Sequence, residues 1–500
     1  MNGSRADAPP GGTLAVVGAG PAGLAATLAA ARRGAGVILI DAAGQAGGQF
    51  YRQPAAELGA RRPRALHHRW RTWEQLRDGL ASLIAEGRVA HLTEHHVWCV
   101  ERHFGDDEPA AAHARPLPPP PGGHRFTVHA LLGPAQERSA AVHADAVLLA
   151  TGGYEKVLPF PGWTLPGVLT AGGAQAMLKG GLVLPGRTAV VAGTGPLLLP
   201  VAVGLAAAGA KVAALVESTG PQAFARHAAA FAAHPDKLAE GAGYAARLLR
   251  HRVPSLPRHT VVEAHGKGAL DAVTVAALDP AGRVRPGTGR RIPCDTLAVG
   301  HGMLPHTDLA EGLGCRVEGP DVAVDAEQRT DVPGVWAAGE TTGIGGAALS
   351  LAEGHIAGRS AAARLRGEVP DPRAWAAAAA SRAKARTFAA AVDAVYAPPA
   401  HWAEQLRDDT LVCRCEEVPA SAVRAAVGEL GATDARSVKL LTRAGMGWCQ
   451  GRMCSAAVAG LVGCAERSAR RPFARPVPLG VLAQTPEARD GDEDEPPAPR

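Results

Sequence analysis

Residues 13–41 read TLAVVGAGPAGLAATLAAARRGAGVILID, and this stretch decides the fold of the first part of the chain. The apolar run Leu14–Val17 predicts a buried strand, residues 18–23 predict a glycine turn, and Ala22–Arg33 predicts a helix. A glycine closes that helix, and a second strand is predicted at Val37–Ile40. This β-α-β order predicts a unit that binds a dinucleotide.

Three glycines of the turn, Gly18, Gly20 and Gly23, have the spacing of a dinucleotide fingerprint. The first allows a tight turn, the second lets the backbone approach a pyrophosphate, and the third lets helix and strand pack closely. Asp41 ends the second predicted strand, 23 positions after Gly18, where a carboxylate can hold ribose hydroxyls. An ordinary glycine turn with a surface aspartate is the alternative; the placement of strand, helix and acid favours the nucleotide site.

The same pattern returns later in the chain. Thr188–Ala192 is a predicted strand, Gly193 and Gly195 form the turn, and Leu197–Ala208 is a predicted helix. Leucine replaces the third glycine, so we expect this helix and strand to pack further apart. Glu217 lies 24 positions after Gly193 and would favour NAD over NADP. The alternative is a degenerate unit that is retained for packing or for a different ligand.

Two further strand ends complete the predicted nucleotide sites. Ala146–Ala150 is a predicted strand that runs into a small-residue turn containing Gly152. Residues 334–340 form another short strand, which ends at Gly339 and Glu340 and precedes a helical run. An acid in that place can accept hydrogen bonds from the ribityl chain of a flavin, while the following helix N-terminus faces the flavin pyrimidine. A helix-capping turn is the alternative.

Four cysteines late in the chain form two close pairs, Cys413-x-Cys415 and Cys449-x4-Cys454, with 33 residues between them. Thiolates suit an iron–sulfur cluster or zinc, and four ligands complete either site. A Cys-x-Cys pair is less usual for structural zinc than Cys-x2-Cys, which favours the cluster. For the other four cysteines we expect core packing: Cys99, Cys294, Cys315 and Cys464. A Cys-x-x-Cys pair is absent from the sequence, so a disulfide-reductase mechanism lacks its thiols.

The bulk composition excludes several classes of function. Five hundred residues with 47% hydrophobic and 20% charged residues predict a globular chain of two or three domains. A net charge of +5, without interleaved aromatic and basic residues, argues against nucleic-acid binding. Residues 188–210 are uncharged and long enough to cross a bilayer, but their glycines and prolines favour a strand, a turn and a helix. We expect a cytoplasmic protein without an integral membrane segment, since residues 1–12 lack the apolar core of a signal peptide.

Four stretches resemble one family of proteins. They are GGQFYR at 47–52, AGETTGIGG at 338–346, CRCEEV at 413–418 and TRAGMGWCQGRMC at 442–454. These stretches resemble the FAD-binding large (alpha) subunits of opine oxidase, of hydrogen cyanide synthase (its B component) and of dye-linked D-hydroxyproline and L-proline dehydrogenases. The C-terminal part is similar to the bacterioferritin-associated ferredoxin-like [2Fe-2S] domain. The likeness extends from about Thr13 to Cys464.

The resemblance implies an α/β flavoprotein with two Rossmann-like dinucleotide-binding domains, of the glutathione-reductase type, and a small C-terminal [2Fe-2S] domain. The expected organisation is a disordered segment at 1–12, an FAD-binding domain in two parts (13–165 and 301–368), a second NAD-like domain (166–300), a helical linker (369–408), the [2Fe-2S] domain (409–465) and a tail (466–500) with a disordered acidic end. Residues 108–123, which are rich in proline and alanine, are expected to form a surface insertion.

The resemblance also implies cofactors and ligands. The expected contacts to FAD are Gly18, Gly20, Gly23, Asp41, Gly48, Gln49, Gly152, Gly339 and Glu340. The expected cluster ligands are Cys413, Cys415, Cys449 and Cys454. NAD, or a second nucleotide or flavin, is expected at Gly193, Gly195 and Glu217 if that unit binds a ligand. The wider class of flavoproteins generally has aspartate where this chain has Glu340. No residue is assigned as a catalytic acid or base.

Related subunits work with a smaller partner of the D-amino-acid-oxidase fold and often with a small second [2Fe-2S] subunit. The leading hypothesis is therefore an oxidoreductase subunit that relays electrons from an amine or amino or imino acid, of opine, D-hydroxyproline, proline or glycine type. One alternative is a self-sufficient NADH-dependent reductase. A second alternative is a non-catalytic scaffold or iron-delivery protein. We expect substrate specificity to reside in another polypeptide.

Overall fold

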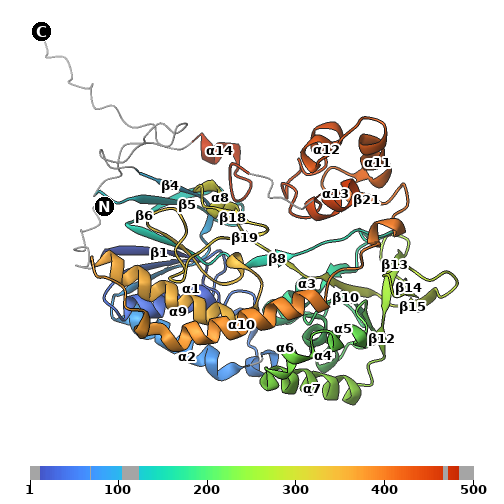
Figure 1. Ribbon diagram of the computed structural model, residues 1–500, viewed down its shortest axis with the longest axis horizontal. Coiled ribbons are helices and arrows are strands. Elements are labelled where there is room, and N and C mark those ends of the chain that lie inside the picture. The colour runs from blue at the N-terminus through green and yellow to red at the C-terminus, as the bar shows by residue number, and fades with distance from the viewer. Residues whose placement is uncertain (1–11, 68, 104–122, 465–470, 484–500) are drawn as a thin grey trace, which may run out of the picture.

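A five-stranded sheet forms the centre of the first unit, which contains the N-terminal part of the chain. The computed structural model describes residues 12–67, 69–103, 123–464 and 471–483 (Figure 1). Five parallel strands form this sheet in the order β20-β7-β1-β2-β3. Their bounds are β1 (Thr13–Val17), β2 (Gly36–Ile40), β3 (Val89–Leu92), β7 (Ala146–Leu149) and β20 (Val335–Ala337). The predicted N-terminal segment, most of the insertion and the acidic tail lie outside the described residues.

Side chains alternate between two cores on either side of this sheet. Leu14 and Val16 face three helices, α1 (Pro21–Ala31), α2 (Trp70–Ala85) and α9 (Gly346–Leu365). Ala15 and Val17 face a three-stranded antiparallel sheet of β4 (His96–Arg102), β5 (Phe126–Leu132) and β6 (Arg138–Ala144). The sheet is thus buried on both faces, which is why β1 and β2 read as continuous apolar runs.

Helices α1 and α9 pack with their backbones unusually close together. A Cβ atom added at Gly354 would lie 2.0 Å from the Ala22 carbonyl oxygen, and one at Gly358 would lie 2.2 Å from that of Ala26. Only glycine allows this approach, so α9 holds the helix that follows the first glycine turn directly against the sheet.

The second unit repeats the same architecture. Its five parallel strands have the order β12-β11-β10-β16-β9. The bounds are β9 (Val168–Thr170), β10 (Thr188–Thr194), β11 (Lys211–Glu217), β12 (Ser255–Pro257) and β16 (Thr296–His301). Helices α3 (Ala171–Gly181), α4 (Leu198–Ala207) and α7 (Pro235–Arg250) belong to one face, and strands β13 (His259–His265), β14 (Ala272–Ala277) and β15 (Arg290–Pro293) cover the other. Short helices α5 (Pro221–Ala225) and α6 (Ala228–Ala232) precede α7.

The two units are joined by a ribbon and by a long helix. Strands β8 (Gly153–Glu155) and β17 (Met303–Pro305) pair antiparallel between them. Helix α10 (Ala376–Val395) packs along α9 and extends to α6 of the second unit, as Figure 1 shows. The chain between residues 369 and 408 is therefore helical at its centre, with 3-10 turns at Pro372–Trp375 and Trp402–Gln405.

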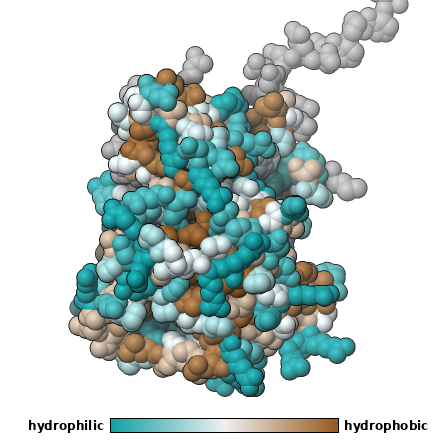
Figure 2. Space-filling view, turned by 90° about the vertical axis from the view of Figure 1, so that its right-hand side faces the viewer, coloured by the Kyte–Doolittle hydropathy of each residue, from teal (hydrophilic) through white to brown (hydrophobic). Residues whose placement is uncertain are grey.

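The C-terminal module has its own small core. It consists of β21 (Leu411–Cys413), β22 (Val418–Pro419), α11 (Ala420–Gly428), α12 (Ala435–Thr442) and α13 (Ser455–Val462). After this module the chain returns to the first unit, where α14 (Leu479–Leu482) packs on Trp98 and Leu131 of the β4–β6 sheet. Figure 2 views the side of the molecule that carries this module, where hydrophilic and hydrophobic side chains are interspersed.

The uncharged stretch that resembled a membrane span folds as a strand, a glycine turn and a helix. Strand β10 runs to Thr194, two residues beyond its predicted end, and α4 begins at Leu198. Across the residues that the structure describes, helices with the length and apolarity to span a bilayer are absent. Smaller elements complete the fold: α8 (Asp308–Gly312), β18 (Val317–Glu318), β19 (Asp321–Val322) and the 3-10 helices η1 (Ala56–Leu58), η2 (Pro63–Leu66) and η3 (Gly339–Thr342).

Candidate functional site

The first glycine turn joins β1 to α1 at the carboxyl edge of the first sheet. Gly18 has φ +107°, and a Cβ atom there would lie 2.3 Å from the Ala150 carbonyl oxygen at the end of the neighbouring strand β7. A Cβ atom at Gly23 would lie 1.8 Å from the Gly18 carbonyl oxygen. These two positions therefore accept only glycine, and the N-terminus of α1 is left as a place for phosphate charge.

Asp41 is fixed beside this turn. Its carboxylate accepts hydrogen bonds from the Ala19 backbone N–H (2.5 Å) and from the Ala43 N–H (2.7 Å). The segment with Gly48 crosses close to the turn, since a Cβ atom at Gly48 would lie 2.7 Å from the Gly20 Cα atom. The structure thus brings together Gly20, Asp41 and Gly48, which are far apart in the sequence. Gln49 lies next to them and accepts hydrogen bonds from the Arg52 guanidinium.

The turn after β20 is held by a buried glutamate and its arginine partner, an ion pair that the sequence did not indicate. Glu353 is fully buried on α9, and its carboxylate accepts hydrogen bonds from the Gly339 N–H (2.9 Å) and the Thr342 hydroxyl (3.0 Å). Arg386 of α10 completes the arrangement with an ion pair at 2.6 Å. The only sequence signal was an acid on an apolar helix, and its partner lies 33 positions away.

Glu340 follows Gly339 in η3, the 3-10 helix that precedes α9. It lines a large cavity between the two units, and its carboxylate pairs with the Gly346 backbone N–H. Burial raises the pKa of the Glu340 carboxyl above its usual value, and the Gly346 N–H opposes that shift. The Glu340 carboxylate therefore lies beside the first backbone N–H group of α9.

The turn after β7 and the turn after β20 are joined by hydrogen bonds to the backbone of one residue, His306. The carbonyl oxygen of His306 accepts hydrogen bonds from the Thr151 hydroxyl (2.7 Å) and the Thr341 hydroxyl (3.0 Å). The His306 N–H donates to the Gly152 carbonyl oxygen at 2.9 Å. Gly152, predicted from its strand end alone, is thereby tied to the Gly339–Thr342 turn.

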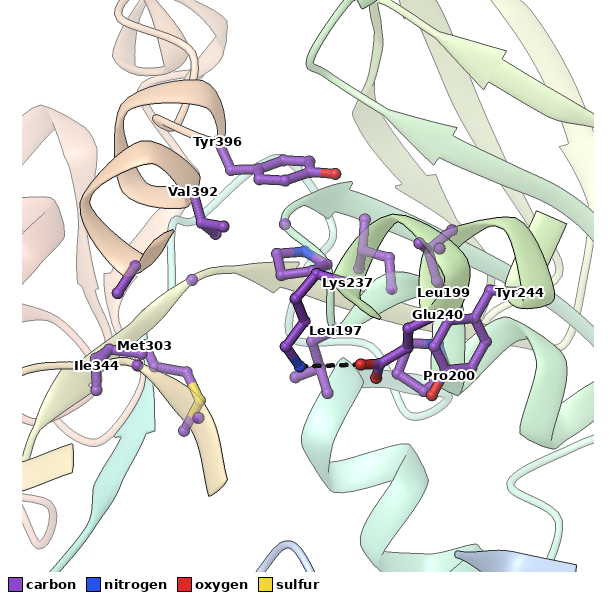
Figure 3. A pocket seen from close by; sticks show the side chains of 18 of the residues that line it. Leu197, Leu199, Pro200, Lys237, Glu240, Tyr244, Met303, Ile344, Val392 and Tyr396 are labelled. Atoms are coloured by element: carbon purple, nitrogen blue, oxygen red, sulfur yellow. Dashed lines mark hydrogen bonds and ion pairs between the residues drawn. The ribbon is translucent and has the colours of Figure 1, made fainter. Parts of the chain in front are cut away.

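The cavity between the two units has a volume of ≈2080 Å³. Figure 3 shows Leu197, Leu199 and Pro200, from the start of α4, across from Met303 and Ile344 of the first unit's side. An ion pair of 2.9 Å between a lysine and a glutamate of α7 is drawn in the same view. Beside the second glycine turn the cavity is lined mainly by apolar side chains, such as Pro196, Leu197 and Leu198.

Two basic groups that line this cavity, His67 of the first unit and Lys179 on α3 of the second, have lowered pKa values. Burial lowers the pKa of the Lys179 ammonium to about 8. Burial, together with Lys179, lowers the pKa of His67 to about 4. His67 is therefore neutral at pH 7, while Lys179 is mostly charged at pH 7. Neither residue was singled out by its sequence context.

The second glycine turn is partly covered by the chain itself. The Glu217 carboxylate accepts hydrogen bonds from the Gly195 N–H (3.3 Å) and the Thr219 N–H (3.0 Å), and burial raises its pKa to about 7. Hydroxyls of Thr194 and Thr219 donate to the carbonyl oxygens of Tyr396 and Val395, each at 3.3 Å. The end of α10 therefore lies on the turn (Figure 3).

The backbone of that turn is nevertheless packed as closely as that of the first turn. A Cβ atom at Gly193 would lie 1.8 Å from the Gly300 carbonyl oxygen of β16, so this position also requires glycine. Gly195 lines the cavity, whereas Glu217 does not. The Glu217 carboxylate is instead engaged by the backbone N–H groups of Gly195 and Thr219.

The four paired cysteines converge in the C-terminal module as two pairs. Cys413 is hydrogen-bonded to Cys454, and Cys415 is hydrogen-bonded to Cys449. Burial and the neighbouring thiols raise the pKa of Cys454, and burial and Cys449 raise that of Cys415. Across the described residues, a group of three or more side chains tight enough for one metal ion is absent. Two thiol pairs fit a [2Fe-2S] cluster, in which each iron takes two protein ligands, better than a tetrahedral zinc site.

Two glycines leave room beside these thiols. A Cβ atom at Gly447 would lie 2.3 Å from the Cys415 Cβ, and one at Gly445 would lie 3.9 Å from the Cys454 sulfur. The loop can therefore bring its backbone close to the sulfurs, as ligation of a compact cluster requires. By contrast, Cys294 and Cys315 are buried away from this loop, and burial raises their pKa values to about 12 and about 11.

Two family descriptions match most of the chain. Pyridine nucleotide-disulphide oxidoreductase matches residues 12–364, and BFD-like [2Fe-2S] binding domain matches residues 411–463. The first match indicates FAD and the second a [2Fe-2S] cluster. The glycine turn between β1 and α1 fits FAD, and the paired thiols of the C-terminal module fit a [2Fe-2S] cluster.

The chain is similar to named subunits of three enzymes, and for the first two the likeness covers nearly the whole length. The HcnB subunit of hydrogen cyanide synthase from Pseudomonas aeruginosa is 34% identical, over 88% of this chain and 90% of that protein. The A component of opine oxidase from Agrobacterium tumefaciens is 31% identical, over 95% and 92%. The alpha subunit of sarcosine oxidase from a Corynebacterium species (strain P-1) is 30% identical, over 69% of this chain and 32% of that protein.

Among solved structures, L-proline dehydrogenase from P. horikoshii has a similar fold. The TM-score is 0.61 at 19% sequence identity, and the match covers 95% of this chain and 79% of that one.

Proposed function

This chain belongs to the family of the hydrogen cyanide synthase subunit HcnB and the A component of opine oxidase, and we propose that it relays electrons within a multi-subunit dehydrogenase. The family resemblance, the fold class and the two cofactors inferred from the sequence are confirmed by the comparisons. The observation that carries the proposal is the combination, in one chain, of a flavin-type glycine turn and two facing pairs of thiols.

The proposal assigns FAD to the first unit. A bound flavin accepts hydride equivalents from a donor and can release electrons singly to a one-electron centre. The residues proposed to hold it are Gly18, Gly20, Gly23, Asp41, Gly48, Gln49, Gly152, Gly339 and Glu340. The chain's own part is to hold this sheet edge rigid, through the Glu353–Arg386 ion pair and the hydrogen bonds to His306.

The proposal assigns the cluster to the C-terminal module, with Cys413, Cys415, Cys449 and Cys454 as ligands. These thiols have to remain reduced to bind iron, which supports a cytoplasmic location. The domain limits proposed from the sequence, with the second nucleotide unit at 166–300 and the cluster module at 409–465, are part of the same proposal.

We propose that the substrate is oxidised on a partner subunit. The relatives are named as components of larger enzymes, which supports a hetero-oligomer. The proposed partner has the D-amino-acid-oxidase fold, with a small [2Fe-2S] protein as a further subunit. The proposed donor is an amine or an amino or imino acid, of the opine, D-hydroxyproline, proline or glycine type.

A self-sufficient NADH-dependent reductase is the second candidate function. It is favoured by one observation: Gly195 of the second unit and Glu340 of the first line the same cavity. The position of α10 on the second turn, where its end bonds Thr194 and Thr219, argues against it.

An anaerobic titration of the purified chain separates these functions. NADH is added first, then dithionite, and the visible absorbance of flavin and cluster is followed. We expect bleaching with dithionite alone, because the electrons come from a partner subunit. Bleaching of both chromophores by stoichiometric NADH would replace the relay proposal with the reductase.

Serine in place of Cys449 tests the cluster ligands. We expect Cys449→Ser to abolish the electron paramagnetic resonance signal of the reduced [2Fe-2S] cluster while flavin content is retained. Cys294→Ser is the control, because that thiol lies in the core of the second unit. A full-strength cluster signal in Cys449→Ser would refute the ligand assignment.

A further inference from the structure

The loop between Cys449 and Cys454 is attached to the first unit by a buried charge cluster. Asp308, the first residue of α8, has a side chain that is 3% exposed. Its carboxylate bonds the guanidinium of Arg452 at 2.8 Å and also that of Arg471. Arg452 lies within the cysteine loop, and Arg471 lies in the segment that follows the module. Their side chains are 16% and 8% exposed.

The same two arginines also hold the backbone of the loop. Arg452 donates to the Cys449 carbonyl oxygen at 3.2 Å, and Arg471 donates to the Gln450 carbonyl oxygen at 2.6 Å. Met453, the next residue, packs on the apolar core of the second unit. Asp308 is therefore the anion on which both loop-holding cations depend.

Asp308 lies two residues after the backbone group that joins the flavin-side turns. His306 bonds Thr151, Gly152 and Thr341 through its backbone. The His306 imidazole Nε2 atom also lies 3.6 Å from the Asp308 carboxylate. A short, rigid path thus runs from the turns proposed to contact FAD to the loop proposed to carry two cluster ligands.

The energetics favour a positioning role over a contribution to stability alone. Burying one carboxylate with two guanidiniums costs desolvation, and hydrophobic residues of similar volume would pack there without that cost. What the ion cluster supplies is geometric specificity, because a guanidinium fork and a carboxylate accept few relative orientations. The two guanidiniums outnumber the one carboxylate, and the remaining positive charge attracts the thiolates carried by the neighbouring loop.

We propose that Asp308 is a positioning residue for electron transfer, which fixes the Cys449–Cys454 loop against the turns of the flavin site through Arg452 and Arg471. The inference rests on the proposed function and its cluster ligands. Electron transfer here means that one electron passes from the reduced flavin to the oxidised cluster, and no bond is made or broken. The rate depends on how closely and how rigidly the two sites are held.

The test is Asp308→Asn in the full chain with both cofactors bound. The change keeps the volume and removes the charge, so both guanidiniums lose their anion. We expect unchanged flavin content and cluster signal, but amide hydrogen exchange at residues 445–453 faster by at least roughly tenfold. Flash reduction of the flavin, followed at the cluster absorbance, should show electron transfer slower by about tenfold as well.

Two further variants keep the outcome decisive. Asp308→Glu retains the charge and should restore most of the transfer rate, which a role in packing alone would not predict. Glu263→Gln removes a different ion pair between the module's entry segment and the second unit, the 2.5 Å contact with Arg407, and should leave exchange and transfer unchanged. If Asp308→Asn does not fold, Arg471→Gln removes one of the two cations and is expected to act in the same direction.

Wild-type exchange and transfer rates in Asp308→Asn, or in Arg471→Gln where only that variant folds, would overturn the inference. Hydrogen exchange is compared between Asp308→Asn and the wild type with the same cofactors bound, so the comparison does not require the identity of each ligand. A cluster signal that survives Cys449→Ser would therefore refute the ligand assignment separately, without deciding the role of Asp308.

Discussion

The two nucleotide units share a backbone and differ in what lies above it. Each has a glycine turn in which an added Cβ atom would collide with a neighbouring carbonyl oxygen, at Gly18 or Gly23 in the first unit and at Gly193 in the second. In the first unit, other segments converge on the turn to build a site. In the second, the end of α10 lies on the turn and bonds Thr194 and Thr219. The glycine spacing therefore predicts the path of the backbone at the turn. Distant segments decide how much open space for a ligand lies next to that turn.

Helix α10 acts on both units at once. Arg386 near its middle stabilises the buried Glu353 beneath the first site, and Val395 and Tyr396 at its end cover the second turn. One helix thus supports one nucleotide site and restricts the other. The predictions below test this difference, from the largest expected effect to the smallest.

The largest difference in flavin binding and stability is expected between two glycine-to-alanine variants, one in each glycine turn. Gly23→Ala places a Cβ atom 1.8 Å from the Gly18 carbonyl oxygen, so α1 cannot keep its place at the turn. We expect loss of bound flavin and destabilisation by at least about 3 kcal/mol. Gly195→Ala meets no atom within 4 Å and carries only the strain of φ +119°, about 1–2 kcal/mol, and should keep its flavin. Flavin absorbance per chain after desalting measures both; retention of full flavin in Gly23→Ala would contradict the assignment.

The second prediction concerns the pH dependence of the free energy of unfolding. The pKa of Glu217 rises from 4.5 to about 7 on folding, so the folded chain binds the extra proton between those values. Stability from this group is complete below pH 4.5 and is lost as the pH rises through 7. Glutamine cannot ionise, so the Glu217→Gln variant does not lose this stability as the pH rises. At pH 8 its free energy of unfolding should exceed that of the wild type by up to about 3 kcal/mol.

Urea unfolding of Glu217→Gln and the wild type at pH 5, 7 and 8 gives the difference directly, so other titrating groups cancel. A difference between Glu217→Gln and the wild type that does not change with pH would mean that Glu217 is ionised in the folded chain.

The smallest expected effect is the opening of the second site. Tyr396→Ala removes the ring at the end of α10, and burial of that ring raises the pKa of its hydroxyl to about 12. We expect ADP-ribose or NADH to bind at least roughly tenfold more tightly to this variant, about 1.4 kcal/mol, as measured by isothermal titration. The double variant Tyr396→Ala with Glu217→Gln should lose that gain. Equal affinities of the wild type and Tyr396→Ala would show that α10 does not restrict the site.

Much of the local structure followed from local spacing. The strand, turn and helix of each unit were predicted within a few residues of their observed ends. An apolar strand, a glycine turn and the apolar spacing of a helix are all short-range patterns, which explains this agreement. The close spacing within each cysteine pair is also a short-range pattern, whereas the fold places Cys413 beside Cys454 and Cys415 beside Cys449. The roles of the individual site residues stay predictions, to be decided by the variants above.

The sequence by itself determined the β-α-β units, the glycine turns with their acids and the thiol spacing, since each depends on residues within about one strand and one helix of each other. Tertiary structure alone decided the Glu353–Arg386 ion pair, the position of α10 on the second turn and the bonding of Asp308 to Arg452 and Arg471. These contacts join residues 33 to 202 positions apart. A charged or polar side chain carries no mark of its partner in the sequence, and only the packed fold selects which groups are buried together.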